Sequence, residues 1–352
     1  MTRGAKAHLA DSFRWSMKEG LDGVTMLSLG IGMGAPVLLA ASAGRLPLGM
    51  VAALGALITG NARTGRTYAE HLKSLGEVRA AATAAAVAAS VVAGQSWLTD
   101  VGMIALACAA ALVGGYSRSL AFGTGRFIVF FVMTLGVMEL GQNRVGVLML
   151  MVAGALWTSV LALALGGLFR AMGWITIAEP EPGSSATAVQ KFRRWKNTLQ
   201  SFAGWQYALR LAFCLGVASI LRWDWPDHHF RWIALTVAIL SHRQLEALPI
   251  KVTQRAIGAA VGVGATGLLI SETPSGWALA CAVAVLAGIG PWLRARNYVA
   301  YTASMTPLII LLLDAGRPVG PGILADRLIA TLIGATLVIA ANMLASRLAD
   351  RL

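Results

Sequence analysis

The chain has 352 residues, of which 57% are hydrophobic and 13% charged, and its mean hydropathy is +0.68. Soluble domains carry about 25% charged residues, so this composition excludes an ordinary soluble enzyme. The formal net charge is +13, but the basic residues lie in short segments between apolar runs. That placement indicates membrane topology and argues against nucleic acid as a partner.

The N-terminal residues 1–21 contain Phe13, Trp15 and Lys18, with basic and apolar residues interleaved. They predict an amphipathic helix on the cytoplasmic membrane surface; the alternative is a disordered tail. Twelve apolar runs follow and predict transmembrane helices, several shorter than the ~20 residues of a straight span. The runs cover about residues 23–43, 46–60, 78–95, 101–116, 126–141, 145–169, 203–221, 230–242, 254–271, 275–292, 298–314 and 325–346.

A basic, polar segment divides the twelve runs into two sets of six. Its stretch Glu179–Ser185 is rich in Pro, Gly and Ser, which is typical of a linker. We therefore predict a first six-helix repeat over residues 22–170, a cytoplasmic linker over 171–202 and a second six-helix repeat over 203–352.

The distribution of basic residues predicts the orientation. With a cytoplasmic N-terminus, 22 of the 29 Lys and Arg residues fall on the cytoplasmic side and six on the outside, and Arg210 lies within a span. This excess predicts a multi-pass protein with twelve spans and both termini in the cytoplasm.

Short motifs recur in the same order in the two halves. The matched pairs are Phe13-Arg14-Trp15 with Phe192-Arg193-Arg194-Trp195, Met133-Thr134 with Met305-Thr306, and Gly154-Ala155 with Gly334-Ala335. Because six is an even number of spans, the repeats are expected to be parallel and related by a pseudo-twofold axis along the membrane normal, as in some transporters. The sequence thus predicts an all-α membrane protein of two repeats; the alternative is a general likeness among apolar six-span sequences.

Two arginines are candidates for a substrate pathway. Arg210 lies about seven residues into the run 203–221, roughly 10 Å deep. Such a charge faces a bundle interior or a watery cavity, or else its side chain extends back to the headgroups. Arg255 opens the run 254–271 and is either an interfacial anchor or part of a basic vestibule that concentrates anions.

Other polar residues lie within or at the ends of apolar runs. Glu139 is a candidate proton carrier or an ordinary interfacial carboxylate. Four further polar residues either form hydrogen bonds within or between helices or line the pathway, and the sequence does not decide between these roles. They are Thr134, Thr236, Thr306 and Asn342.

Motifs of catalysis and cofactor binding are absent from the sequence. The glycines from Gly262 to Gly267 match G-x-G-x-x-G but follow no strand and lie in an apolar run, so they predict close helix packing. We predict no enzyme activity, no catalytic or metal site and no cofactor.

The second half resembles a known family. Trp232, Leu235 and Thr236, followed by Arg255, Gly258 and Gly262, are similar to the core pattern of the fusaric acid resistance protein-like (FUSC) family of the aromatic acid exporter superfamily. Ala208-Leu209-Arg210 and the stretch Asp326–Gly334 fit the same pattern, so the resemblance covers about residues 203–346. The first half resembles the family only through the repeat.

The resemblance implies two six-span blocks and export of aromatic or other organic carboxylic acids, sometimes with a periplasmic adaptor protein. The large cytoplasmic domain of many members is absent from the sequence, because the linker has only about thirty residues. We expect a secondary transporter in the bacterial inner membrane. Arg210 is expected to bind the carboxylate, with Arg255 at the inner mouth. The alternatives are a passive organic-anion channel and a non-transporting scaffold or assembly factor. The expected partners are lipid and the substrate, and the oligomeric state is open.

Overall fold

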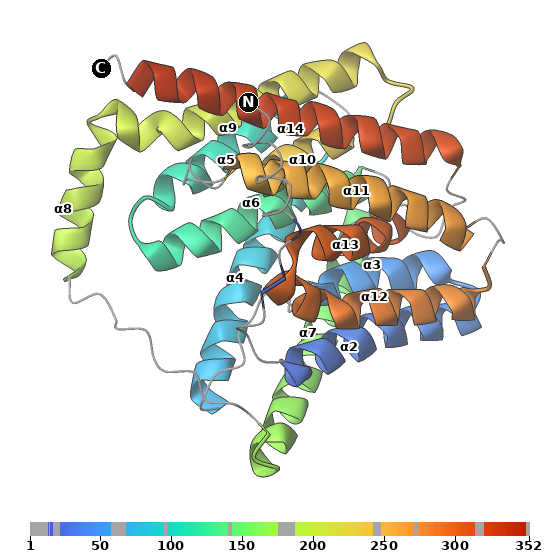
Figure 1. Ribbon diagram of the computed structural model, residues 1–352. Coiled ribbons are helices and arrows are strands. Elements are labelled where there is room, and N and C mark those ends of the chain that lie inside the picture. Colours follow the sequence, from blue (N-terminus) through green and yellow to red (C-terminus); the bar gives the residue numbers. More distant parts are fainter. Residues whose placement is uncertain are drawn as a thin grey trace. The chain divides into compact units, whose positions relative to one another are not determined.

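The computed structural model describes residues 13, 15–16, 22–57, 68–94, 97–139, 143–174, 187–241, 248–270, 274–313 and 320–349, all helices and connections without a strand. The helices are α2 (Gly23–Ser42), α3 (Leu46–Leu57), α4 (Tyr68–Val92), α5 (Trp97–Val113), α6 (Arg118–Met138), α7 (Arg144–Ala171), α8 (Ala188–Leu199), α9 (Phe202–Asp224), α10 (Arg231–Leu240), α11 (Leu248–Ile270), α12 (Gly276–Arg296), α13 (Tyr298–Leu313) and α14 (Pro321–Ala349) (Figure 1).

Each of the twelve predicted apolar runs coincides with one helix, but several helices begin earlier than predicted. α4 begins at Tyr68 instead of residue 78, and α6 begins at Arg118 instead of residue 126. Hydropathy marks the part of a helix that suits lipid, whereas capping fixes where the helix starts. The Ser117 hydroxyl accepts a hydrogen bond from the Leu120 amide and so caps α6 at a polar position.

The lengths of the helices identify a multi-pass membrane protein. Within the described residues, seven helices are long and apolar enough to cross a membrane, namely α2, α4, α6, α7, α9, α12 and α14. Four further apolar helices, α3, α5, α10 and α13, are shorter, with 10–17 residues each. An ideal straight span requires about 20 residues.

The helices form two compact units. The first comprises Met1–Ala80, Asn143–Ala178 and Ile250–Leu328, and the second comprises Ala81–Gln142, Glu179–Pro249 and Ile329–Leu352. In the first unit, α2 packs against α3, α7 and α12. In the second unit, α9 packs against α5, α8 and α10, and α6 packs against α5 and α10.

Glycines allow close helix approach within the first unit. A side chain on Gly55 of α3 would overlap the Met151 carbonyl of α7, and one on Gly154 of α7 would overlap the Ala52 carbonyl. The backbones of α3 and α7 are therefore in direct contact, which larger residues would prevent.

The glycines of the G-x-G-x-x-G stretch have different surroundings. Gly262 of α11 packs closely against Thr306 of α13, as predicted, and Gly258, one turn earlier, packs against Thr302. The same prediction is wrong for Gly264, where an added Cβ would meet nothing within 4 Å. Gly264 lies two residues after Gly262, so it points to another side of the helix.

The predicted surface helix over residues 1–21 lies almost wholly outside the described residues. Of its described part, the Phe13 carbonyl accepts a hydrogen bond from Asn297 Nδ2 at 3.0 Å, and the Ser16 amide donates to the Arg296 carbonyl at 2.8 Å. Trp15 lies 5.9 Å from Trp292, ring centre to ring centre. This part of the chain is therefore attached to the end of α12.

Candidate transport site

A ladder of polar contacts joins α9 to α14 in the second unit. Gln206 donates to the Ala345 carbonyl at 3.4 Å, Arg210 donates to the side-chain oxygen of Asn342, and Cys214 contacts the Leu337 carbonyl at 3.6 Å. The α9 residues are four positions apart and so lie on one face of the helix. Because their partners run in the opposite order, the two helices are antiparallel.

Arg210 is the charged group at the centre of this ladder and is only 9% exposed. Its Nε donates to the Gln206 carbonyl at 3.4 Å, and the guanidinium lies 6.0 Å from the centre of the Tyr207 ring. The oxygens of Gln206 and Asn342 are neutral, so they orient the guanidinium without cancelling its charge. A desolvated cation held in this way attracts an anion strongly.

Asn342 adds a second hydrogen-bond donor beside Arg210. Its amide oxygen accepts from the guanidinium, so its amide nitrogen points elsewhere. That nitrogen is buried and has no hydrogen-bond partner among the described residues. An unsatisfied buried donor costs about 1–3 kcal/mol, which a bound acceptor would recover. The structure thus brings Arg210 and Asn342, two predicted site residues, into one arrangement.

Thr236 and Thr134 are the other predicted pathway residues of the second unit. Thr236 of α10 is fully buried, and its hydroxyl has no hydrogen-bond partner among the described residues. The side chain packs against Gly334 of α14, where an added Cβ would lie 2.9 Å from the Thr236 side chain. Thr134 is buried on α6. Thr236 therefore contacts the same helix that carries Asn342.

Glu139, the predicted proton carrier, belongs to an ion cluster. Arg222 Nη1 lies 3.0 Å from both carboxylate oxygens of Glu139, and Nη2 lies 3.0 Å from Asp100 Oδ2. Asp100 also accepts hydrogen bonds from Ser219 at 3.1 Å and from the Trp223 indole at 2.8 Å. One guanidinium therefore bridges two largely buried carboxylates at the C-terminal end of α9.

Sequence reasoning missed two of the three charged members of this cluster. In the sequence, Arg222 contributes only to the charge count on the outer side, and Asp100 lies in the first turn of an apolar helix. Carboxylates are scarce near apolar runs, so each one is a signal of an ion pair, because a buried charge requires a partner. At least one basic residue at the same membrane level was therefore to be expected.

Arg255 and Thr306 lie in the first unit, so they are not brought together with Arg210 inside one compact unit. Arg255 of α11 is 5% exposed, and its Nε is buried without a hydrogen-bond partner in the described part of the chain. The Thr306 hydroxyl donates to the Thr302 carbonyl at 2.8 Å, and its Cβ side packs against Gly262. Thr306 thus contributes to helix packing. Because its hydroxyl hydrogen is already donated, the Thr306 oxygen can only accept a further hydrogen bond.

Further basic residues of the first unit are buried or half-buried. Arg327, which the charge count places at the outer side, is fully buried at the start of α14 beside Asp326. Arg79 Nε donates to the Ser159 hydroxyl at 2.7 Å, and Arg170 Nη2 lies 3.3 Å from His71 Nδ1. Their burial could not be read from a count of charges, because the count records only the side of the membrane.

Comparison with known proteins gives one match. Neither the search of curated proteins nor that of solved structures found a similar chain. The family model described as fusaric acid resistance protein-like matches residues 211–341. This range contains Thr236, Arg255 and Thr306, and it begins directly after Arg210. Over these residues the chain is similar to the fusaric acid resistance protein-like family, in agreement with the motifs that the sequence shares with it.

Proposed function

We propose that the protein is a transporter that exports organic carboxylic acids, with Arg210 binding the carboxylate. The pairing of Arg210 with Asn342 is the observation that carries the proposal. Together they present a guanidinium and an amide donor that has no partner among the described residues. Two adjacent donors, one of them charged, match the two oxygens of a carboxylate. The family match and the apolar helices support a membrane transporter.

An aromatic acid is the proposed substrate class within the organic acids. The Tyr207 ring next to Arg210 offers a stacking surface, and the buried Thr236 hydroxyl offers a further hydrogen bond. Arg255, in the first unit, is proposed as a second residue that binds the anion. Thr134 and Thr306 complete the proposed pathway, Thr306 as an acceptor. The chemistry requires no cofactor and no enzymatic step.

Two repeats of six helices are the architecture that we propose for this transporter. The make-up of the units supports it. The first unit combines the first, second and sixth apolar helices of the N-terminal half with the third to fifth of the C-terminal half. The second unit combines the third to fifth apolar helices of the N-terminal half with the first, second and sixth of the C-terminal half. The first part of α4 and the first residues of α14 belong to the first unit instead.

Matching contacts in the two halves also support the repeat. Trp15, which precedes the first span, packs on Trp292 near the end of α12. Trp195, which precedes the seventh, donates to the Leu112 carbonyl near the end of α5 at 3.0 Å. The recurring aromatic motif therefore contacts the fourth helix of the opposite half in both cases.

A passive organic-anion path is the second candidate function, and the state of Glu139 favours it. Both Glu139 oxygens lie 3.0 Å from Arg222, so the carboxylate is engaged in an ion pair and does not stand alone on a pathway. Coupling to protons requires this ion pair to open. A proton gradient imposed on liposomes separates the candidates, because only a coupled carrier accumulates the substrate against its own gradient.

Uptake of labelled benzoate into liposomes that contain the purified protein tests the site. We expect Arg210→Ala to lower the initial rate about tenfold or more, because a charged hydrogen bond contributes roughly 1.5–3 kcal/mol. Asn342→Asp should lower it as well, since a new carboxylate would neutralise Arg210. Arg118→Ala removes an exposed cation and is the control. Wild-type rates in the Arg210→Ala protein would refute the assignment, and a complete lack of flux with a stably co-purifying partner would favour a scaffold.

The proposed cellular setting is the inner membrane of a bacterium, with both termini in the cytoplasm. The excess of Lys and Arg in alternate connections supports this orientation. A periplasmic adaptor protein is a proposed partner that the family resemblance alone suggests.

A further inference from the structure

α8 is a strongly basic helix within the segment that connects the two halves of the chain. Its 12 residues include Lys191, Arg193, Arg194 and Lys196 but no acidic residue, and none of its residues is buried. Thr187 caps the helix, and Gln190 completes a capping box with it. Such caps stabilise a short helix at the chain surface.

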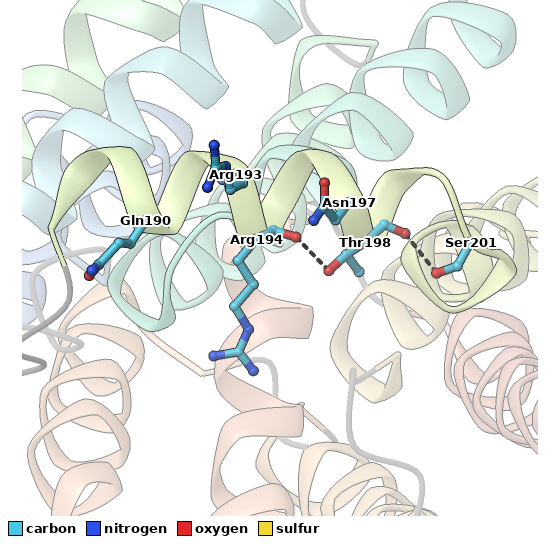
Figure 2. A pocket seen from close by; sticks show the side chains of 6 residues that line it. All are labelled: Gln190, Arg193, Arg194, Asn197, Thr198 and Ser201. Atoms are coloured by element: carbon cyan, nitrogen blue, oxygen red, sulfur yellow. Dashed lines mark hydrogen bonds between the residues drawn. The ribbon is translucent and has the colours of Figure 1, made fainter.

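Apolar and polar side chains occupy separate sides of α8. At about 3.6 residues per turn, Phe192, Trp195 and Leu199 share one face, and Lys191 and Lys196 flank it. The opposite side forms a shallow hollow of about 560 Å³. Figure 2 shows its lining, with the Arg193 and Arg194 side chains pointing away from the helix on two sides; the lining residues are Gln190, Arg193, Arg194, Asn197, Thr198 and Ser201.

Contacts inside the second unit attach α8 to the end of α5. The Trp195 indole donates to the Leu112 carbonyl at 3.0 Å, and the Tyr116 hydroxyl donates to the Ala188 carbonyl at 3.3 Å. Gly115 leaves the space that Trp195 occupies, because a Cβ there would lie 3.2 Å from the indole. α5 is an apolar helix, so α8 is held where an apolar helix ends.

The corner between α8 and α9 sets the direction of α8. The Trp205 indole donates to the Leu199 carbonyl at 2.8 Å and closes this corner. In Figure 1, α8 turns away from α9, which is long and apolar enough to cross a membrane. An amphipathic helix that turns aside where a spanning helix begins is placed to lie along the membrane surface.

We propose that α8 is an interfacial helix that binds anionic phospholipids. Phe192, whose side chain is 52% exposed, inserts among the upper acyl carbons, while Trp195 stays packed against the end of α5. Lys191 and Lys196, at the edges of that face, bind lipid phosphates, and Arg193 and Arg194 lie among the headgroups. A membrane is the occupant because the chain itself spans one and because a helix with four cations and no anion is complementary to acidic lipid.

Lipid quenching of a label on α8 tests the proposal in the full-length protein. In a background in which Cys108, Cys214 and Cys281 are replaced by Ala, bimane is attached at Ala188→Cys on the apolar side or at Asn197→Cys on the polar side. The proteins are placed in vesicles of phosphatidylcholine with increasing phosphatidylglycerol, both with brominated acyl chains. We expect strong quenching at position 188, growing with phosphatidylglycerol, and weak quenching at position 197.

Charge-matched variants separate lipid binding from general electrostatics. Lys191→Gln with Lys196→Gln should raise severalfold the phosphatidylglycerol fraction needed for half-maximal quenching. Lys73→Gln with Arg118→Gln removes two exposed cations elsewhere and should leave it unchanged. Equal quenching at both label positions, or no effect of phosphatidylglycerol, overturns the proposal, and so does cross-linking of two copies through Ala188→Cys without quenching.

A second measurement needs no cysteine replacement. Wild-type protein purified in mild detergent from phosphatidylglycerol-rich membranes should retain more of this lipid than the variant without Lys191 and Lys196, as measured by mass spectrometry. Equal retention by the two proteins contradicts the proposal.

Discussion

Arg222 determines the charge balance at the C-terminal end of α9. Its guanidinium contacts Glu139 and Asp100 at 3.0 Å, and its side chain is 23% exposed. Asp100 has further donors in Ser219 and the Trp223 indole. Glu139 has only Arg222 as a partner among the described residues. Removing the arginine therefore leaves two carboxylates close together, and one of them loses its partner.

We predict that Arg222→Gln destabilises the protein by about 2–3 kcal/mol, because an uncompensated buried charge is more costly than a lost surface pair. Thermal unfolding in detergent should show a clearly lower Tm than for Arg144→Gln, which removes an exposed arginine. Combining Arg222→Gln with Glu139→Gln should restore part of the loss, since the carboxylate then no longer needs a cation. An Arg222→Gln protein as stable as the Arg144→Gln control would contradict this account.

Helix packing depends on small residues at particular positions. Gly154 of α7 lies against the Ala52 backbone of α3, and backbone cannot move aside as a side chain can. Gly264 of α11 has nothing within 4 Å of an added Cβ. Both glycines lie inside helices, so the gain in helix propensity from Gly to Ala, about 1 kcal/mol, is the same for the two.

Gly154→Ala should therefore lower the Tm and the yield of folded protein, whereas Gly264→Ala should leave the Tm unchanged or raise it slightly. Size-exclusion profiles and thermal unfolding of the two variants, measured side by side, check this difference. Equal tolerance of both substitutions would mean that α3 and α7 are not in direct backbone contact.

Hydropathy located the helices because burial in lipid selects apolar residues along them. It did not locate helix starts such as Tyr68 of α4, since these lie in polar sequence. In the candidate site, Arg210 could be recognised alone because a charge within a span is rare. Its pairing with Asn342 could not, because the two residues are joined only when α9 packs antiparallel to α14.

On the scale of the whole molecule, neither half of the sequence contains a complete compact unit. The first unit takes α2, α3 and α7 from the N-terminal half and α11, α12 and α13 from the C-terminal half. In that unit α2 packs against α12, and α3 packs against α13. Helices of one half therefore cover apolar faces of the other, so a half by itself leaves these faces without their partners.

This composition predicts the behaviour of a chain divided in the connecting segment. Residues 1–178 and 179–352, expressed separately, should aggregate or be degraded, because each fragment lacks helices that its units need. Expressed together, they should assemble and co-purify through a tag on one fragment, with benzoate uptake restored in part. A shorter N-terminal fragment that ends after α6, at residue 142, serves as control and should not assemble with residues 179–352, since α7 supplies the partner of α3. If residues 1–178 alone gave a monodisperse, cooperatively unfolding protein, the half would be a self-sufficient bundle and the exchange of helices between halves would be refuted.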